Sequence, residues 1–185
     1  MIRRARSRGY TVVELMMALG VFATGVTGII AMQRTTVAAN RHARSVVVAT
    51  GIAQAWLDQL TADSSLWQSD LTQTTWLKSV DTAGLNGNWQ LPAHVGDRDF
   101  GPRFDLFGNA DDAADAYCAH IRLTRLYPGT PGVLRAEVRV FWVRDGGTRV
   151  DDDCTSAAAA TIADVGVATD DYHFVYQAGA VGQRR

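Results

Sequence analysis

The two cysteines, Cys118 and Cys154, are the residues of this 185-residue chain whose chemistry is easiest to assign. They lie far apart in the sequence and form no CxxC pair of the kind that holds a metal. In an oxidising compartment a disulfide between them would stabilise the fold by roughly 3 to 4 kcal/mol through loop closure. We therefore expect a Cys118 to Cys154 disulfide if the domain is exported, with two buried free thiols as the alternative.

Catalytic and metal-binding motifs are missing from the sequence. It contains no HExxH, GxSxG, Walker A or GxGxxG motif, and its four histidines are scattered singly. Aspartates gather in short runs, such as residues 111–115 and 151–153, but none follows the ligand spacing of an EF-hand loop. We interpret these aspartates as solvated loop charges rather than as a calcium site, and we expect no enzymatic activity, no metal and no cofactor.

A carboxylate stands at the entrance of the longest apolar segment. Residues 15–33 carry no charge, and as a helix they span about 28 Å, close to the hydrocarbon thickness of a membrane. Glu14 comes directly before this segment. An unpaired carboxylate costs roughly 2.5 to 3.5 kcal/mol at the centre of a membrane helix and less at its boundary. Glu14 therefore needs a partner that neutralises it or a route back to water.

The arginines before the apolar segment predict its orientation. Residues 1–9 hold four of the 18 basic residues and no acid, which places this leader in the cytoplasm and the chain beyond about residue 34 outside. A secretory signal peptide shares the basic start and apolar middle. The apolar run is longer than a usual signal core, Glu14 stands at its entrance, and no A-x-A-like cleavage site follows. We therefore expect a retained membrane anchor.

Residues 8–15, Arg-Gly-Tyr-Thr-Val-Val-Glu-Leu, resemble the signature of the type IV prepilin family. The resemblance implies that a membrane peptidase cuts after Gly9 and methylates the new N-terminal residue, Tyr10, while the anchor stays on the chain. It also implies that Glu14, then the fifth residue, pairs with the N-terminal amine of a neighbouring subunit and sets the register of assembly. Tyr10 stands where the family usually has phenylalanine.

A second pattern narrows the resemblance. Residues 23–29, Ala-Thr-Gly-Val-Thr-Gly-Ile, are similar to the minor pilins of the PilV type, and Ala31 stands where major pilins usually have proline. The resemblance implies a minor pilin of a type IV pilus, incorporated at or near the tip to prime or modulate assembly. It would reside in the inner membrane as a single-pass protein with a periplasmic body, and in the extracellular pilus after assembly.

The same resemblance implies the partners. These are the prepilin peptidase, the inner-membrane assembly platform, other major and minor pilins, and a tip adhesin. Without its leader the chain keeps 14 basic and 19 acidic residues, a formal charge of about −5, so we expect no nucleic acid. Two alternatives stay open: a pseudopilin of a type II secretion or DNA-uptake system, and a membrane-tethered periplasmic ligand-binding domain or enzyme.

A long helix must carry these groups. Apolar residues continue at helical spacing past the membrane length, which predicts one helix over residues 11–62. Residues 10–33 would form its transmembrane half and residues 34–62 its amphipathic half. The apolar stripe of the outer half consists of Val46, Ala49, Ala53, Trp56, Leu57 and Leu60. We expect Trp56 to pack in the core.

Alternating apolar and polar residues predict an antiparallel sheet in the C-terminal region, residues 118–185. Its strands are expected at residues 119–126, 134–142 and 172–177. The disulfide would then clip the C-terminal region to the sheet.

Between helix and sheet, residues 63–117 keep no clear period. We expect a variable, loop-rich connection with a short helix near residues 66–80 and a short strand at residues 88–91. The predicted fold class is α+β and type IV pilin-like, with a long N-terminal helix packed on a small antiparallel sheet and a disulfide near the C-terminus.

Overall fold

A computed structural model describes residues 10–95, 100–111, 113–127 and 132–183 of the chain. The chain divides into two compact units, Met1–Arg44 and Ser45–Arg185. The predicted leader and the cleavage position at Gly9 lie outside the described residues.

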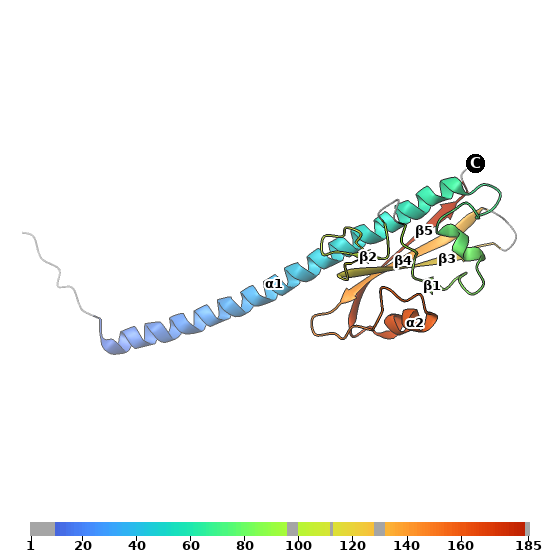
Figure 1. Ribbon diagram of the computed structural model, residues 1–185. Helices are drawn as coiled ribbons and strands as arrows, with labels where there is room; N and C mark the ends of the chain where they lie inside the picture. The colour runs from blue at the N-terminus through green and yellow to red at the C-terminus, as the bar shows by residue number, and fades with distance from the viewer. Residues whose placement is uncertain (1–9, 96–99, 112, 128–131, 184–185) are drawn as a thin grey trace, which may run out of the picture. The chain divides into compact units, whose positions relative to one another are not determined.

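The main helix, α1, runs from Val12 to Asp63 and confirms the predicted helix to within a residue at each end (Figure 1). Within the first unit its residues 15–33 carry no charge, and nearly all of the helix side chains there are exposed. Among the described residues, α1 is the one helix whose length and composition suit a membrane span. The chain can therefore be anchored by a single apolar helix near its N-terminus.

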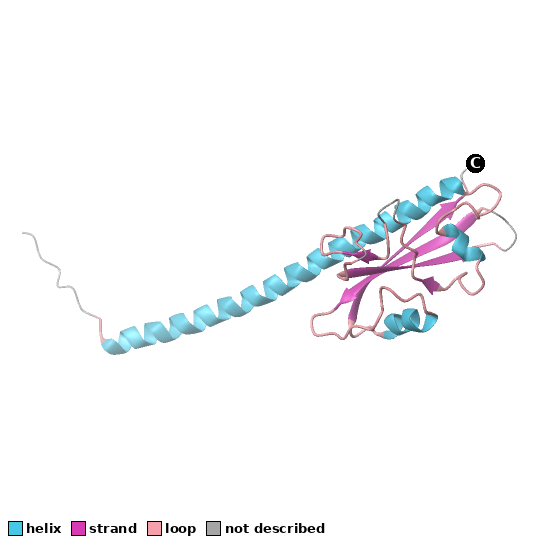
Figure 2. Cartoon of the chain, viewed as in Figure 1, coloured by secondary structure: helices cyan, strands magenta, loops and turns pink. Residues whose placement is uncertain are grey.

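The second unit contains an antiparallel sheet, drawn in magenta in Figure 2, and its strand order is β1-β3-β4-β5. The long strands are β3 (Tyr117–Arg125), β4 (Val133–Val143) and β5 (Tyr172–Gly182). They confirm the three predicted strands, although β5 continues five residues past the predicted end. That extension has the sequence Ala-Gly-Ala-Val-Gly, whose low β-propensity gives no sign of a strand in the sequence. Pairing with β4 holds it in the sheet.

Two short strands complete the sheet. Strand β1 (Trp89–Gln90) falls within the predicted segment 88–91, and β2 (Arg103–Phe104) was not expected from the sequence. Both pair antiparallel with β3.

The main core lies between the outer part of α1 and one face of the sheet. Alternate residues of β4, including Ala136, Val138 and Val140, are fully buried there, as the predicted alternation requires. Trp56 is also fully buried, which confirms its predicted place in the core. Of the other predicted stripe residues, Ala49, Ala53 and Leu60 are fully buried, whereas Val46 and Leu57 are half-buried.

The segment between helix and sheet differs from the prediction. Instead of a helix over residues 66–80 there are two short 3-10 segments, Ser64–Leu66 and Leu77–Asp81, joined by turns. The connection is also more than a surface loop, because its Trp67, Leu71 and Trp76 are buried in the main core. Trp76 meets Trp56 edge to face, with 5.4 Å between ring centroids. Because these core side chains come from turns and loops, they do not recur at a helical or strand spacing, and the hydrophobic periodicity of the sequence could not predict their burial.

A buried carboxylate closes this connection at the end of α1. Asp63, the last residue of α1, is fully buried. Its carboxylate accepts hydrogen bonds from the backbone N–H groups of Thr75, Trp76 and Leu77, at 2.8, 2.9 and 3.2 Å. The peptide dipoles thus solvate the charge, and their hydrogen bonds offset the desolvation cost of the buried carboxylate without a cation.

We predict that Asp63→Asn lowers the free energy of unfolding of the full chain by about 1.5 to 3 kcal/mol. The amide removes the charge and directs an NH₂ group toward N–H donors that lose their acceptor. Urea unfolding in detergent micelles, followed by tryptophan fluorescence, measures the change. The matched control is Asp58→Asn on an exposed position of the same helix, expected to change stability by less than about 0.5 kcal/mol. Equal stabilities for the two variants would contradict this role of Asp63.

Candidate functional site

The N-terminus of α1 is set by Thr11. Its side-chain oxygen accepts a hydrogen bond from the backbone N–H of Glu14 at 3.3 Å, and its carbonyl accepts one from Leu15 at 3.2 Å. Thr11 is therefore the N-cap residue, and the helix begins at Val12. Tyr10 stays outside the helix and is exposed. Sequence reasoning missed the capping role of Thr11, which the spacing Thr-x-x-Glu could have revealed.

The Glu14 carboxylate lies in the first turn of this helix and is exposed. In a complete capping box it would fold back and accept the N–H of Thr11, but only the threonine half of the box is formed. Within the part of the chain that the structure describes, the Glu14 carboxylate makes no ion pair or hydrogen bond. The positive end of the helix dipole favours it by only about 0.3 to 1 kcal/mol. The group is therefore available to an external cation.

The helix surface around Glu14 is suited to close contact with other helices. Val13, Leu15 and Met17 beside it are exposed apolar side chains. Further along, a Cβ atom added at Gly20, Gly25 or Gly28 would meet no described atom within 4 Å. Packing among the described residues therefore gives no reason for glycine at these positions, whereas close approach of a neighbouring helix does.

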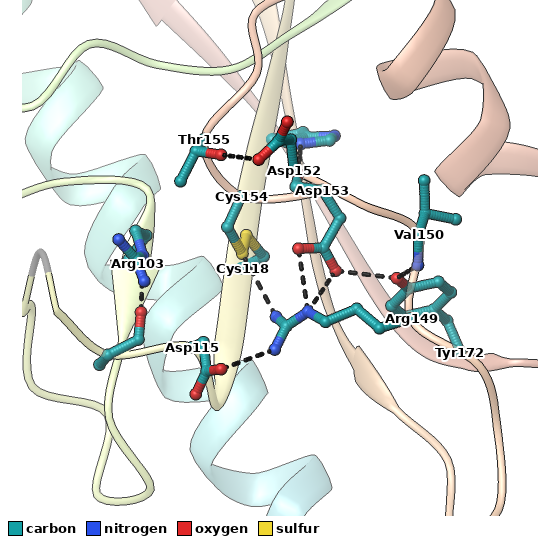
Figure 3. Close-up of a disulfide and its surroundings, with 12 residues drawn as sticks. Arg103, Asp115, Cys118, Arg149, Val150, Asp152, Asp153, Cys154, Thr155 and Tyr172 are labelled. Atoms are coloured by element: carbon teal, nitrogen blue, oxygen red, sulfur yellow. Dashed lines mark hydrogen bonds and ion pairs between the residues drawn. A yellow bond between two sulfur atoms is a disulfide. The ribbon is translucent and has the colours of Figure 1, made fainter.

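The disulfide predicted from the sequence is present (Figure 3). Cys118, in β3, is joined to Cys154, in the turns after β4, with 5.6 Å between their Cα atoms. The Asp153 carboxylate lies close enough to both sulfur atoms for the three groups to resemble a metal site. Both sulfur atoms are committed to the disulfide, however, and the carboxylate is occupied by hydrogen-bond donors, so the chemistry of these groups is that of a covalent clip.

Those donors form a network around the clip, also visible in Figure 3. Arg149 donates from Nε to both oxygens of Asp153, at 3.0 and 2.9 Å, and makes an ion pair with Asp115 at 3.1 Å. Tyr172 donates its hydroxyl to Asp153 at 2.8 Å and accepts the N–H of Val150. Burial raises the pKa of Tyr172, so the hydroxyl keeps its proton and stays a donor. The network holds the segment that carries Cys154 against the start of β5.

A second buried network lies on the sheet face opposite α1. His120 of β3 pairs in register with Arg139 of β4, and both are almost completely buried. Arg139 donates to Nδ1 of His120 at 2.7 Å and to the carbonyl of Ile162 at 2.7 Å. Ile162 belongs to helix α2 (Ala159–Val167), which sequence reasoning did not predict. Arg139 thus ties α2 to the sheet.

The tautomer of His120 follows from these contacts. Because a guanidinium can only donate, Nδ1 must accept, and Nε2 carries the proton and donates to the carbonyl of Asp153 at 3.2 Å. Burial, and then the charge of Arg139, lower the pKa of His120 to about 3. A neutral His120 therefore joins the disulfide segment, through Asp153, to the second face of the sheet.

The residues predicted to be functional fall into two separate groups. Tyr10 and Glu14 belong to the first unit, and the cysteine pair belongs to the second. No protein-family model, curated protein or solved structure matches the chain.

We predict that His120 makes the fold sensitive to acid. Its folded-state pKa lies below the value near 6.5 of an unfolded histidine, so its contribution to stability is complete above about pH 6.5 and is lost as the pH falls toward 3. The loss should amount to about 2 kcal/mol between about pH 7 and pH 5.

The variant His120→Gln tests this prediction, because its side-chain amide offers an NH₂ donor group and a carbonyl acceptor but cannot take up a proton. Urea unfolding of the full chain at several pH values should show that the wild type loses stability faster than the variant as the pH falls. All other acid-sensitive groups are the same in both proteins, so the difference between the two stability curves isolates the contribution of His120. Parallel stability curves would show that His120 does not carry the effect.

Proposed function

We propose that the chain is a minor pilin, a structural subunit that enters a type IV pilus after its leader is cut. One observation carries the proposal: the Glu14 carboxylate heads an exposed apolar helix and is left without a partner by the described residues. It follows a Gly9-Tyr10 pair and a basic leader, the sequence context in which prepilins are cut.

Cleavage after Gly9 would create the missing cation. In the uncut chain the nitrogen of Tyr10 is a peptide amide without charge. After the cut it is an amine with a pKa near 8, which is positively charged at neutral pH. The partner of Glu14 thus exists only on processed subunits, which makes processing a condition of assembly.

The energies favour pairing between subunits. Two unit charges about 4 Å apart attract by about 4 kcal/mol at an effective dielectric constant of 20. This is comparable to the roughly 2.5 to 3.5 kcal/mol that an unpaired carboxylate costs at the centre of a membrane helix. A neighbour's amine can therefore offset the cost of holding Glu14 in an apolar environment. Because any other register would leave Glu14 unpaired in that apolar environment, the pairing also selects one register between helices.

The second unit supports an exported location. The Cys118 to Cys154 disulfide suits an oxidising compartment outside the cytoplasm. The arginine-rich leader would hold the N-terminus in the cytoplasm and direct the sheet unit to the other side. In the proposed pilus, α1 serves as the polymerising element and the sheet unit as the contact surface near the tip.

A pseudopilin of a type II secretion or DNA-uptake system is the second candidate, since Gly9, Tyr10 and Glu14 would serve it equally well. The two differ in what the apparatus moves. A deletion strain scored together for pili, twitching motility, secreted enzymes and transformation distinguishes them: loss of pili and motility favours the pilus, and loss of secretion or transformation alone favours the pseudopilin.

We predict that Gly9→Val leaves the precursor uncut, because a branched side chain blocks the peptidase at the scissile bond. An immunoblot should show one band, larger than the mature chain by the nine leader residues. The control is Arg8→Lys, which keeps the leader charge and should be cut normally. Normal processing and piliation in the Gly9 variant would refute the proposed function.

We also predict that Glu14→Gln is cut normally but enters filaments at least about tenfold less than the wild type, because the amide cannot attract the amine of a neighbour. Quantifying the subunit in sheared filaments against the membrane fraction gives this ratio. Glu14→Asp keeps the charge and should recover most of the incorporation. If Gln and Asp at this position behave alike, the charge of Glu14 is not what directs assembly.

A further inference from the structure

The two edges of the sheet are finished differently. The outer edge of β3 is covered by β1 and β2 and by the backbone around them. There the N–H of Gly87 donates to the carbonyl of Leu123, and the N–H of Ala119 donates to the carbonyl of Pro102, both at 2.8 Å. At the other edge, β5 pairs with β4 alone, in an unbroken register from Tyr172 to Gly182.

The direction of the backbone groups of β5 follows from its hydrogen bonds. The pairs at both ends of the ladder, Asp171 with Arg144 and Gln183 with Gly132, are hydrogen-bonded at 2.8 and 3.0 Å. In an antiparallel ladder, hydrogen-bonded pairs alternate with pairs that are not hydrogen-bonded. Because residues 171 and 183 both belong to hydrogen-bonded pairs, the odd-numbered residues of β5 point their N–H and C=O groups at β4, and the even-numbered residues point theirs away. Tyr172 agrees, since its N–H goes to Ala168 and its carbonyl accepts from the Arg144 side chain.

Beyond Tyr172 this outward row is open. The backbone N–H and C=O groups of residues 174, 176, 178 and 180 make no hydrogen bond with any described part of the chain. Tyr176, Ala178 and Ala180 are exposed. The second unit therefore presents a row of backbone donors and acceptors that the described residues leave unpaired.

The edge also lacks the features that keep sheet edges apart. Residues 174–183, Phe-Val-Tyr-Gln-Ala-Gly-Ala-Val-Gly-Gln, contain no charge and no proline, and the β4 to β5 register has no bulge. Edge strands of soluble proteins usually carry such devices, because an unprotected edge pairs with other chains. The interior strand β4 does carry charges, among them Arg135 and Glu137. The unprotected edge of β5 can therefore pair with another strand.

We propose that the free edge of β5 binds an extended strand of a different polypeptide in the assembled state, by strand addition to the sheet. The proposal rests on the proposed membrane-anchored assembly, which excludes a second copy of this chain. Antiparallel pairing of two β5 edges places a twofold axis normal to the sheet, so the outer parts of the two α1 helices, which pack on the sheets, would run in opposite directions. Two copies anchored in one membrane enter it in the same direction.

Head-to-tail pairing of copies is excluded as well. It would require β5 of one copy to meet an open edge of the next, but the edge of β3 is already occupied by β1 and β2. The strand must therefore come from another protein.

The chemistry of the edge describes the partner strand. Opposite residues 174–182 it should be uncharged, because β5 carries no charged side chain over that stretch. On the face directed toward α1, the Oε1 atom of Gln177 is buried and has no hydrogen-bond partner among the described residues. A serine, threonine or asparagine of the partner strand beside Gln177 would supply the missing donor. On the other face, Ala178 and Ala180 leave room for β-branched or aromatic side chains.

Residue-resolved hydrogen exchange of the full chain tests the proposal, with detergent-purified protein compared against the membrane and sheared-filament fractions of the cells that produce it. In the purified chain, the amides of Tyr176, Ala178 and Ala180 should exchange fast, while those of Val175 and Gln177 are protected by β4. In the assembled fractions, the even-numbered amides should slow by about tenfold or more.

The variant Ala178→Pro removes one outward N–H and leaves every β4 to β5 hydrogen bond in place. Protection of Tyr176 and Ala180 in the assembled fractions should then be lost. Ala178→Thr keeps the N–H and should retain it. If Ala178→Pro fails to fold, as loss of protection at Val175 in the purified protein would show, Ala178→Lys replaces it as an edge-blocking charge.

Three results would overturn the proposal. The first is protection of the even-numbered amides already in the purified chain, and the second is fast exchange of these amides in both states. The third is the formation of disulfide-linked homodimers by single cysteines placed in turn at residues 176–180, which would identify a second copy as the occupant. An immunoblot for leader removal on the same samples separates the two ideas. Processed, incorporated protein with an unprotected edge refutes strand addition alone, whereas unprocessed protein refutes the proposed function.

Discussion

Burial of one stripe of α1 against one face of the antiparallel sheet is the contact on which the second unit depends. Trp56 and Leu60 are completely enclosed there by strand residues and by aromatic side chains from the connection. Each large side chain buried in this way contributes about 1.5 to 3 kcal/mol. The same helix begins with an apolar segment that is long enough to span a membrane, so one continuous element can lie partly in lipid and partly in water. Glu14 stands at the start of that segment and Asp63 at the end of the helix.

These two carboxylates show opposite solutions to the same electrostatic problem. Asp63 is buried and is satisfied within the chain by three peptide N–H groups. Glu14 is not satisfied by the described residues, although a threonine in the right place caps the helix beside it. Glu14, exposed and without a partner among the described residues, is free to make the intermolecular contact that we propose for it.

Periodicity made the large elements predictable from the sequence. The helix and the three long strands have clear patterns, and two cysteines allow only one intramolecular pair. Helix α2 was missed because its nine residues are short and mostly apolar or small, without a polar face. The core residues of the connection were missed because Trp67, Leu71 and Trp76 reach the core from turns, where no repeat marks them. The burial of Arg139 could not be predicted either, because in β4 it alternates like a surface charge, and it is helix α2 and the Trp89 ring that cover it.

The position of Cys154 before β5 has a consequence for the order in which the fold can form. A chain made from its N-terminus presents Cys154 before the last strand appears, so the disulfide can close on β3 and β4 alone. Tyr172, the first residue of β5, then finds Asp153 and Val150 already held in place. The first side chain of the final strand can thus set the register in which β5 pairs with β4.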